Sequence, residues 1–248
     1  LGVPPGDWIL TAFPRQQPAQ ARLTLSTRIS VSRGPLDDVI LQAVPPQRIS
    51  GTVSFDDPSA TPDWRRINVI VRPFGEAFNI SSNAGRPNPE GAFELTASGS
   101  GMGRIDVVGL PAPGSYLASI RCGSTDLTHR PFPLDQPLAA PLSITFRAGA
   151  ARIQGQVESR QPAVVLLYPA DPEARDTTPL TRTDTAPTGE FTLSDLAPGS
   201  YLLYAVLPDD PLALSAAEPP SDLERRATRV TLEPNATAPV TLAIQEDR

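Results

Sequence analysis

Residues 189–201 read GEFTLSDLAPGSY, and this stretch decides how the rest of the chain is interpreted. Phe191 and Leu193 are separated by single polar residues, and strand side chains alternate between two faces, so this part predicts a strand with one buried face. Pro198 presets φ near −65°, and Gly199 can adopt the positive φ that other residues resist, so a turn follows. The stretch therefore predicts a sharp corner between two β-strands.

Tyr201 stands directly after this corner and begins the apolar run YLLYAVL, which we expect to be the second strand. A tyrosine at such a corner often buries its ring and donates its hydroxyl to nearby backbone, as in the tyrosine corner of β-sandwiches. We therefore expect Tyr201 to have a structural role rather than to stack on a ligand.

Two partial copies of the corner occur upstream, at Pro113–Tyr116 and at Pro5–Trp8, where Trp8 takes the place of the tyrosine. The spacing between the copies is unequal, although each has proline, glycine and an aromatic residue in the same order. This pattern predicts domains of one type that carry different insertions.

Three units follow from these repeats: residues 1–46 as the C-terminal half of a β-sandwich, residues 47–148 as a complete sandwich, and residues 149–248 as another. The last two open on related strands, ISGTV and IQGQV. Gly51 lies on the inward face of the first of these strands, which indicates close approach of another group. In the middle unit, residues 91–108 are interpreted as a hairpin with the glycines of residues 99–103 at its tip, and residues 91–102 as the clearest insertion.

Shorter segments complete the prediction. In the first unit, strands are expected over residues 21–32 and 37–44. Residues 171–188 are expected to form a charged loop. Ser221 and Glu224 have capping-box spacing and predict one or two helical turns through Ala227.

The composition favours an all-β protein. Thirty prolines and 17 glycines in 248 residues argue against helical bundles, because proline interrupts helix interiors. No apolar run approaches the roughly 18 residues of a membrane span. Tandem Greek-key β-sandwiches with minimal helix, prealbumin-like or immunoglobulin-like, are the predicted fold class.

The charged residues exclude several functions. All 21 basic residues are arginine, so lysine Schiff bases, phosphate-loop lysines and lysine isopeptide bonds are excluded. The net charge of −6 and the isoelectric point near 4.9 disfavour nucleic acid and anionic membranes as partners.

The sequence offers few residues for a metal or cofactor site. It contains one cysteine, Cys122, and one histidine, His129, and no second ligand stands at zinc spacing. Three aspartate pairs are possible calcium ligands, but none follows the EF-hand pattern, and solvated loop charge is the favoured interpretation. These pairs are Asp37–Asp38, Asp56–Asp57 and Asp209–Asp210. We expect no catalytic residues, no metal and no cofactor.

The ordered set of motifs resembles the carboxypeptidase regulatory-like domains, transthyretin-like or prealbumin-like sandwiches found in tandem in bacterial secreted and cell-envelope proteins. The matching pieces are the two openings, the segment Asp184–Leu193, the corner LAPGSY and the closing VTLEPNATAPVTLAI. The resemblance implies an extracellular or cell-envelope location. It does not carry over the activity of the zinc peptidase that gives the family its name, because the ligand set is absent.

Three functions follow as hypotheses. The first is a non-catalytic structural or interaction module that spaces, displays or assembles parts of a larger envelope or secreted protein, with other domains or subunits as partners. The second is a carbohydrate-binding module, for which Trp64, in a polar loop, is the candidate ligand-binding residue; the alternative is that Trp64 holds its loop on the sandwich. The third is assembly by strand exchange through the incomplete first unit, with a fragment of a longer chain as the alternative explanation.

Overall fold

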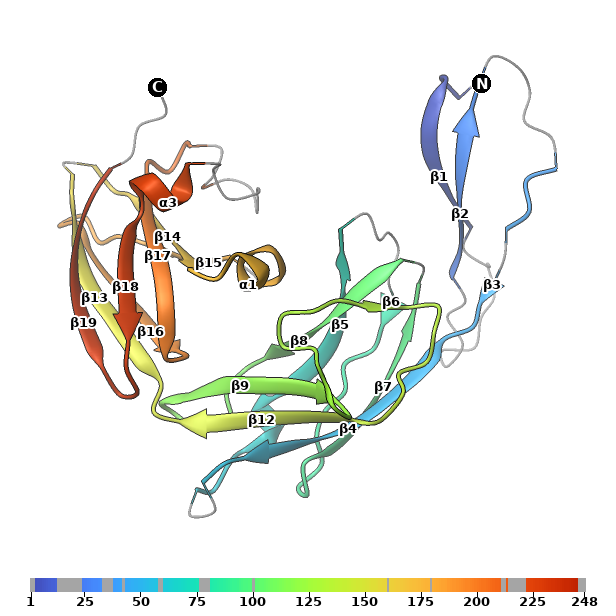
Figure 1. Ribbon diagram of the computed structural model, residues 1–248, viewed down its shortest axis with the longest axis horizontal. Coiled ribbons are helices and arrows are strands. Elements are labelled where there is room, and N and C mark those ends of the chain that lie inside the picture. Colours follow the sequence, from blue (N-terminus) through green and yellow to red (C-terminus); the bar gives the residue numbers. More distant parts are fainter. Residues whose placement is uncertain are drawn as a thin grey trace. The chain divides into compact units, whose positions relative to one another are not determined.

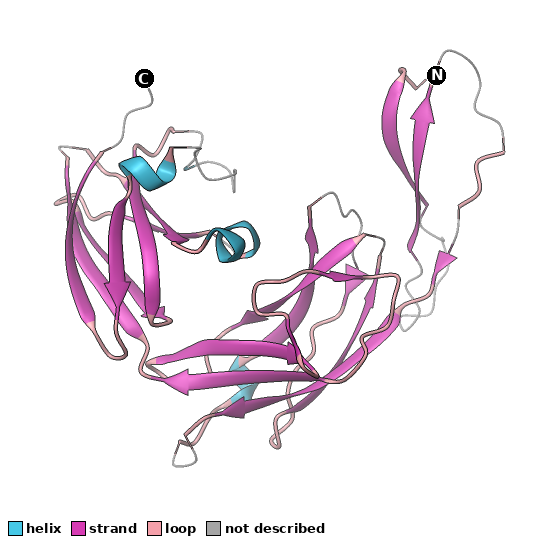
Figure 2. Ribbon diagram, viewed as in Figure 1, coloured by secondary structure: helices cyan, strands magenta, loops and turns pink. Residues whose placement is uncertain are grey.

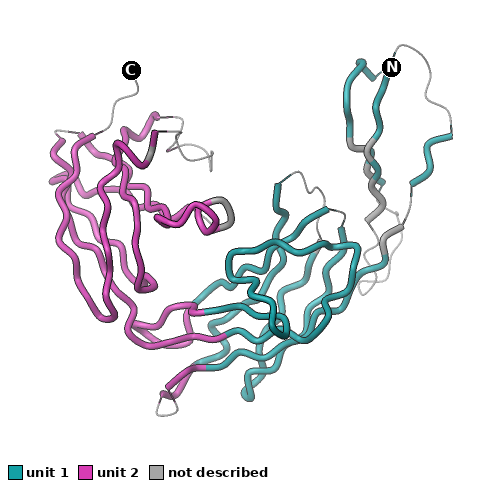
Figure 3. Tube along the Cα trace, in the orientation of Figure 1, with its two compact units in different colours: residues 1–54, 63–109, 119–144 teal, residues 55–62, 110–118, 145–248 magenta. Residues whose placement is uncertain are grey.

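The computed structural model of the chain contains two compact units, which are coloured separately in Figure 3. One comprises residues 1–54, 63–109 and 119–144, and the other comprises residues 55–62, 110–118 and 145–248. The predicted division at residues 46 and 148 stays a prediction. The structure describes residues 3–12, 24–32, 38–41, 43–57, 60–75, 81–99, 101–159, 161–178, 180–210, 213 and 222–244.

Strands make up most of the described residues and helices few, which confirms the predicted all-β class (Figure 2). No helix in the described ranges has the length and apolar character needed to cross a bilayer.

The first sheet, which we call the N-terminal hairpin sheet, has the order β1-β2-β3 and antiparallel pairing (Figure 1). Its strands are β1 (Gly6–Ala12), β2 (Thr24–Val31) and β3 (Ala43–Val44). The strand predicted over residues 21–32 is confirmed within β2. Of the strand predicted over 37–44, residues 43 and 44 form β3, and residues 37 and 42 lie outside the described residues. The prediction is wrong for residues 38–41, where Asp38 has φ of 61° and the Ile40 side chain is 80% exposed.

The middle sandwich has one sheet of order β10-β9-β12-β4-β7-β6 and another of order β11-β8-β5. A 3-10 turn, η1 (Trp64–Arg66), precedes β5. The strands of the middle sandwich are β4 (Gln47–Phe55), β5 (Asn68–Phe74), β6 (Ser81–Ser82), β7 (Ala92–Ser98), β8 (Met102–Val108), β9 (Ser115–Cys122), β10 (Thr125–Asp126), β11 (Phe132–Pro133) and β12 (Leu142–Ala148).

The inserted hairpin predicted over residues 91–108 is wrong. β7 pairs with β4, whereas β8 pairs with β5, so the chain passes from one sheet to the other between these strands. The physical reason is the apolar alternation: Phe93 and Leu95 on β7 and Ile105 on β8 are all buried in the sandwich. Both strands are therefore main strands of the sandwich.

The predicted close approach at Gly51 is confirmed, and Gly155 repeats it. Each glycine lies opposite a phenylalanine in the ladder, Gly51 opposite Phe93 and Gly155 opposite Phe191. A Cβ on Gly51 would lie 2.7 Å from the Phe93 ring and 2.5 Å from a backbone carbonyl oxygen. Neither position has room for a side chain.

The C-terminal sandwich pairs a sheet of order β16-β13-β19 with a sheet of order β15-β14-β17-β18. Side chains from both sheets form its inner core, including Ile153, Phe191 and Leu203. Its elements are β13 (Ala151–Glu158), β14 (Val164–Pro169), α1 (Pro172–Thr177), β15 (Thr181–Asp184), β16 (Glu190–Leu196), β17 (Gly199–Val206), α3 (Leu223–Arg226), β18 (Thr228–Leu232) and β19 (Thr237–Ala243).

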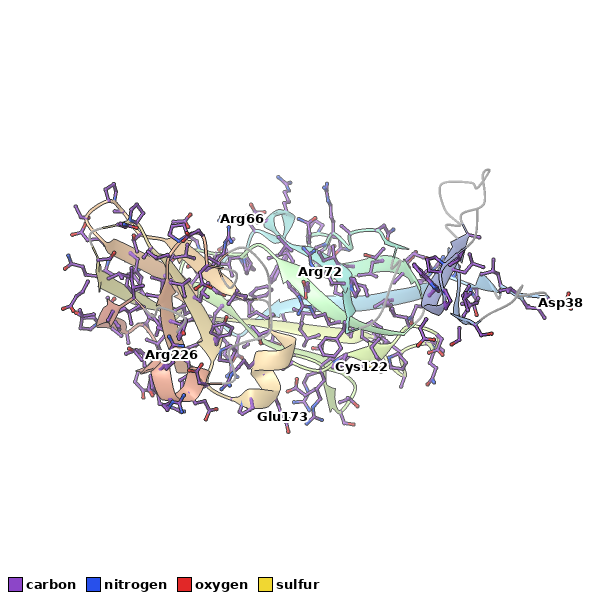
Figure 4. The ribbon with its side chains drawn as sticks, turned by 90° about the horizontal axis from the view of Figure 1, so that it is seen from above. Asp38, Arg66, Arg72, Cys122, Glu173 and Arg226 are labelled. Atoms are coloured by element: carbon purple, nitrogen blue, oxygen red, sulfur yellow. The ribbon has the colours of Figure 1, made fainter. Side chains whose placement is uncertain are left out.

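A second core, which we call the outer core, covers the opposite face of β14 and β17. Its members are buried and mainly apolar, and they are Val164, Leu166, Tyr168, Ala170, Leu202, Tyr204, Val206 and Ala213. Arg226 of α3, labelled in Figure 4, places its guanidinium 5.5 Å from the centre of the Tyr204 ring. The central strands are therefore buried on both faces.

The charged loop predicted over 171–188 is wrong in part, because it contains α1 and β15. Asp171 caps α1 by accepting a hydrogen bond from the Glu173 amide, and Pro172 begins the helix. Proline at the first helical position after an aspartate cap is a recognised start signal. The helix predicted through Ala227 is confirmed as α3, while its expected cap, Ser221, lies outside the described residues.

Candidate functional site

Trp64 lies in the 3-10 turn η1, within a polar loop as expected. Asp63 closes this turn, since its carboxylate accepts a hydrogen bond from the Arg65 amide at 3.2 Å. The indole is partly buried, and a Cβ added at Gly91 would lie 3.7 Å from its Nε1 atom. The ring thus lies over the backbone at Gly91, a geometry in which it can hold the loop in place. Carbohydrate binding by Trp64 stays a prediction.

We expect Trp64→Ala to lower the free energy of unfolding by about 1–2 kcal/mol, because a half-buried aromatic ring loses its contacts. Urea denaturation measures this loss, and Arg65→Ala, an exposed neighbour in the same turn, is the matched control. A glycan array run with the same proteins separates the two roles. Glycan binding that Trp64→Ala abolishes without any change in stability would favour the sugar-binding role.

The corner at Tyr201 has the predicted structural role. The Tyr201 hydroxyl donates a hydrogen bond to the carbonyl oxygen of Ala197, four residues earlier, at 2.7 Å. The strand that follows, β17, pairs with β14 on one side and β18 on the other. This confirms a tyrosine corner that joins the two sheets of the C-terminal sandwich.

The copy of the corner at Pro113–Tyr116 does not have the same structure, which corrects the expected equivalence. The strand after it, β9, lies in the six-stranded sheet next to β12, not in the sheet that contains β5 and β8. Its glycine also differs, with φ of 67° at Gly114 compared with 154° at Gly199. The same four residues therefore form two different turns.

The copy at Pro5–Trp8 does match the corner in detail. The Trp8 indole Nε1 donates to the carbonyl oxygen of Pro4, again four residues earlier, at 2.9 Å. Gly6 has φ of 148°, close to the value at Gly199. The first and third corners are therefore equivalent, with an indole N–H replacing a phenol O–H.

Burial, together with the neighbouring Tyr116, raises the pKa of Tyr201 above its ordinary value of 10.0. Burial likewise raises the pKa of Tyr168, helped by Tyr204. A raised pKa of a phenol means that the folded state favours the protonated form. This contribution to stability is complete below about pH 10 and is lost as the pH rises through the folded-state values.

We therefore expect the free energy of unfolding to fall above about pH 10 and expect Tyr201→Phe to make this fall shallower. At neutral pH, Tyr201→Phe should cost about 1 kcal/mol, because one hydrogen bond is lost. Tyr168→Phe is the matched control, since its hydroxyl has no hydrogen-bond partner among the described residues and its loss should be neutral at pH 7. Urea titrations from pH 7 to about pH 11 measure both effects. An unchanged alkaline profile in Tyr201→Phe would contradict the assignment.

Where the structure describes them, the titratable residues singled out in the sequence form no metal-binding group. No group of three or more histidine, cysteine, aspartate or glutamate side chains that could hold a metal occurs within the described ranges. Cys122 is buried, and its thiol donates to the carbonyl oxygen of Ala140 at 3.2 Å. Asp56 pairs with Arg147 at 2.8 Å, whereas Asp37 lies outside the described residues.

Comparisons with known proteins return solved structures only. No family model matches the chain, so the resemblance to carboxypeptidase regulatory-like domains stays a prediction. No curated protein matches it either.

Several solved structures of bacterial proteins are similar at low identity. A streptococcal ancillary pilin has 12% identity and a TM-score of 0.31, over 99% of this chain and 77% of the pilin. GBS52, the minor pilin of Streptococcus agalactiae, has 12% identity and a TM-score of 0.29, over 82% of this chain and 98% of GBS52. The Bacillus anthracis TIE protein has 10% identity and a TM-score of 0.28, and the match covers 96% of this chain but only 41% of that protein. TM-scores this low establish no relationship.

Proposed function

We propose that the chain is a non-catalytic structural or interaction segment of an extracellular or cell-envelope protein. In this role, successive β-sandwiches space, display or assemble the other parts of a larger polypeptide. Its partners are then other protein domains or subunits.

One observation carries the proposal: the same loop-and-strand element is built twice. In the middle sandwich, the Val53 amide donates to the Gly91 carbonyl at 2.8 Å, and in the C-terminal sandwich the Val157 amide donates to the Gly189 carbonyl at 2.9 Å. The preceding turns also match, with amide-to-carbonyl distances of 2.9 Å for Gly91 to Asn88 and 2.8 Å for Gly189 to Ala186. Repetition of one element, each copy packed on its own buried strands, is the organisation expected of a spacer.

Polar side chains in the loops support the same conclusion, because several of them close turns. The Asn88 side chain accepts from the Ala92 amide, and the Asp126 carboxylate accepts from the Thr128 amide, each at 2.8 Å. The Asp171 carboxylate caps α1. Side chains that satisfy neighbouring amides in this way stabilise the loops that join strands.

The test of the proposal combines activity and location. We expect no turnover on a panel of ester, peptide and glycoside substrates, and turnover on any of them would overturn the non-catalytic role. An antibody raised against the purified chain should label intact source cells or their medium. Amine-reactive labels have no lysine side chain to modify in residues 1–248, so the antibody is the better probe. Labelling that requires permeabilised cells would contradict the proposed location.

A further inference from the structure

The N-terminal hairpin, β1 with β2, reproduces the pairing of β17 with β18 in the C-terminal sandwich. In both pairs the corner glycine faces a branched apolar residue, the corner aromatic faces isoleucine or valine, and a leucine faces threonine. The matched pairs are Gly6–Val31 and Gly199–Leu232, Trp8–Ile29 and Tyr201–Val230, and Leu10–Thr27 and Leu203–Thr228. The two hairpins therefore share one register.

The polar contacts across the two hairpins also correspond. Between the glycine and the aromatic residue, Ser30 donates to the carboxylate of Asp7, and the Ser200 and Thr231 hydroxyls are hydrogen-bonded at 3.0 Å. These are the same ladder position in each pair. Together with the shared corner, this agreement makes β17 a template for what surrounds β1.

The template shows which element lies beside this strand. The edge of β17 that faces away from β18 is paired with β14, which runs antiparallel to it. In this pairing Leu166 lies opposite Tyr204, and Tyr168 lies opposite Leu202. The same offset places the corresponding partner of β1 alongside Ile9 and Thr11. Within the described part of the chain, β1 pairs with β2 alone.

The side chains of Trp8 and Leu10 on β1 are correspondingly exposed. Leu203 is 1% exposed in the inner core of the C-terminal sandwich, whereas Leu10, at the same position of the hairpin, is 38% exposed. Trp8, the counterpart of Tyr201, is 42% exposed. An open strand edge next to exposed apolar side chains is a surface on which another strand can pair.

We propose that the edge of β1 binds an extended apolar strand that is antiparallel to β1 and similar in chemistry to β14. This inference rests on the proposed assembly role and names the class of partner. β14 reads VVLLYP, with five consecutive buried residues, as a strand covered on both faces requires. A second copy of β1 does not supply this pattern, because Asp7 and Thr11 interrupt its apolar residues.

The chain contains its own test peptide, residues 161–171 (QPAVVLLYPAD), which includes β14. This peptide, capped at both ends, is titrated into the full chain, and binding is followed by calorimetry and by the fluorescence of Trp8. We expect saturable binding that Leu10→Asp weakens by at least about tenfold, because a carboxylate then faces the strand-binding surface. Val108→Asp is the matched control, since Val108 is 47% exposed on β8 of the middle sandwich and should leave binding unchanged.

N-methylated peptides identify pairing through the strand edge. In a strand that joins an edge, only alternate amides point to the neighbouring strand. Methylation of one alternating set of peptide amides should abolish binding, and methylation of the other set should retain it. Equal effects of the two sets would overturn the proposal, because adhesion through side chains alone does not distinguish them.

Several further outcomes have defined meanings. Absence of saturable binding, or equal binding to Leu10→Asp, overturns the proposal. Dimerisation through β1 that excludes the peptide, measured by sedimentation, also overturns it by making a second copy the occupant. A circular dichroism spectrum and a thermal transition of Leu10→Asp that match those of the wild type show that this variant is folded. Trp8→Phe, which retains an aromatic ring, is a second variant and should bind the peptide with a reduced fluorescence change. If the peptide does not bind and no substrate is turned over, the strand-binding proposal fails and the non-catalytic structural role stands. If the peptide binds and a substrate is turned over, only the non-catalytic role is overturned.

Discussion

Replacing Gly155 with alanine is expected to lower the free energy of unfolding of the C-terminal sandwich by about 3 kcal/mol. The new Cβ would lie 2.3 Å from the carbonyl oxygen of Val240 and 2.7 Å from the ring of Phe191. Val240 is the ladder partner of Gly155 on β19, so this carbonyl moves only if the pairing of β13 and β19 shifts. The ring is fixed as well, because Phe191 is buried in the inner core.

Urea denaturation followed by circular dichroism measures the loss. Gln154→Ala is the matched control on the same strand, since its side chain is exposed and its removal should cost less than about 0.5 kcal/mol. The double variant Gly155→Ala/Phe191→Leu removes the contact with the ring but keeps the contact with the carbonyl. Adding Gly155→Ala to Phe191→Leu should therefore lower the free energy of unfolding by less than adding it to the wild type, but it should still lower it. A denaturation midpoint of Gly155→Ala equal to that of the wild type would refute the close approach.

Leu202→Ala and Leu203→Ala should each cost about 3 kcal/mol, although the two side chains point to opposite faces of β17. Leu203 belongs to the inner core and Leu202 to the outer core, and each is 1% exposed. In a strand with one solvated face, only one of two successive leucines would be sensitive. Equal losses would therefore show that the outer core contributes to stability as the inner core does.

Thermal and urea denaturation of the two single variants provide this measurement, with Thr192→Ala on the exposed face of β16 as the control. The prediction fails if Leu202→Ala unfolds like the control. In that case the outer core would contribute little to the free energy of unfolding of the sandwich.

Local chemistry in the sequence predicted some features correctly. Alternation in GEFTL and the residues PGSY predicted a strand, a corner and the tyrosine hydrogen bond, because each depends on neighbours within a few residues. Gly51 was also informative, since an inward glycine in an apolar strand indicates close approach. Fold class followed from many such short signals.

Pairing between distant strands could not be predicted from the same signals. PGSY occurs at residues 113–116 and 198–201, yet the strands that follow enter different kinds of sheet. A turn motif determines local backbone angles, whereas the neighbours of a strand depend on packing across the whole unit. Asp171–Pro172 was a helix start signal that the sequence analysis missed, because the surrounding charges were interpreted as a solvated loop.

For the candidate site, the sequence indicated that Trp8 stands in a corner position, but not that this corner alone reproduces the one at Tyr201. The distinguishing observations are the φ value of Gly6 and the register of β1 with β2, and both are conformational. Trp64 was correctly placed in a polar loop. Its position over Gly91 depends on a contact between residues 27 positions apart, which no local pattern encodes.

The pairing of β13 with β19 has a mechanical consequence. These strands are parallel, they are the first and last of the C-terminal sandwich, and they are paired from Arg152–Thr237 to Glu158–Ala243. Tension applied to the two ends of this sandwich would pull β13 by its start and β19 by its finish, which are opposite ends of the ladder. The force would then act along the strands and load their hydrogen bonds together in shear, whereas a hairpin pulled from its open end would release them one after another. A sandwich closed in this way is suited to resist force applied along these two strands.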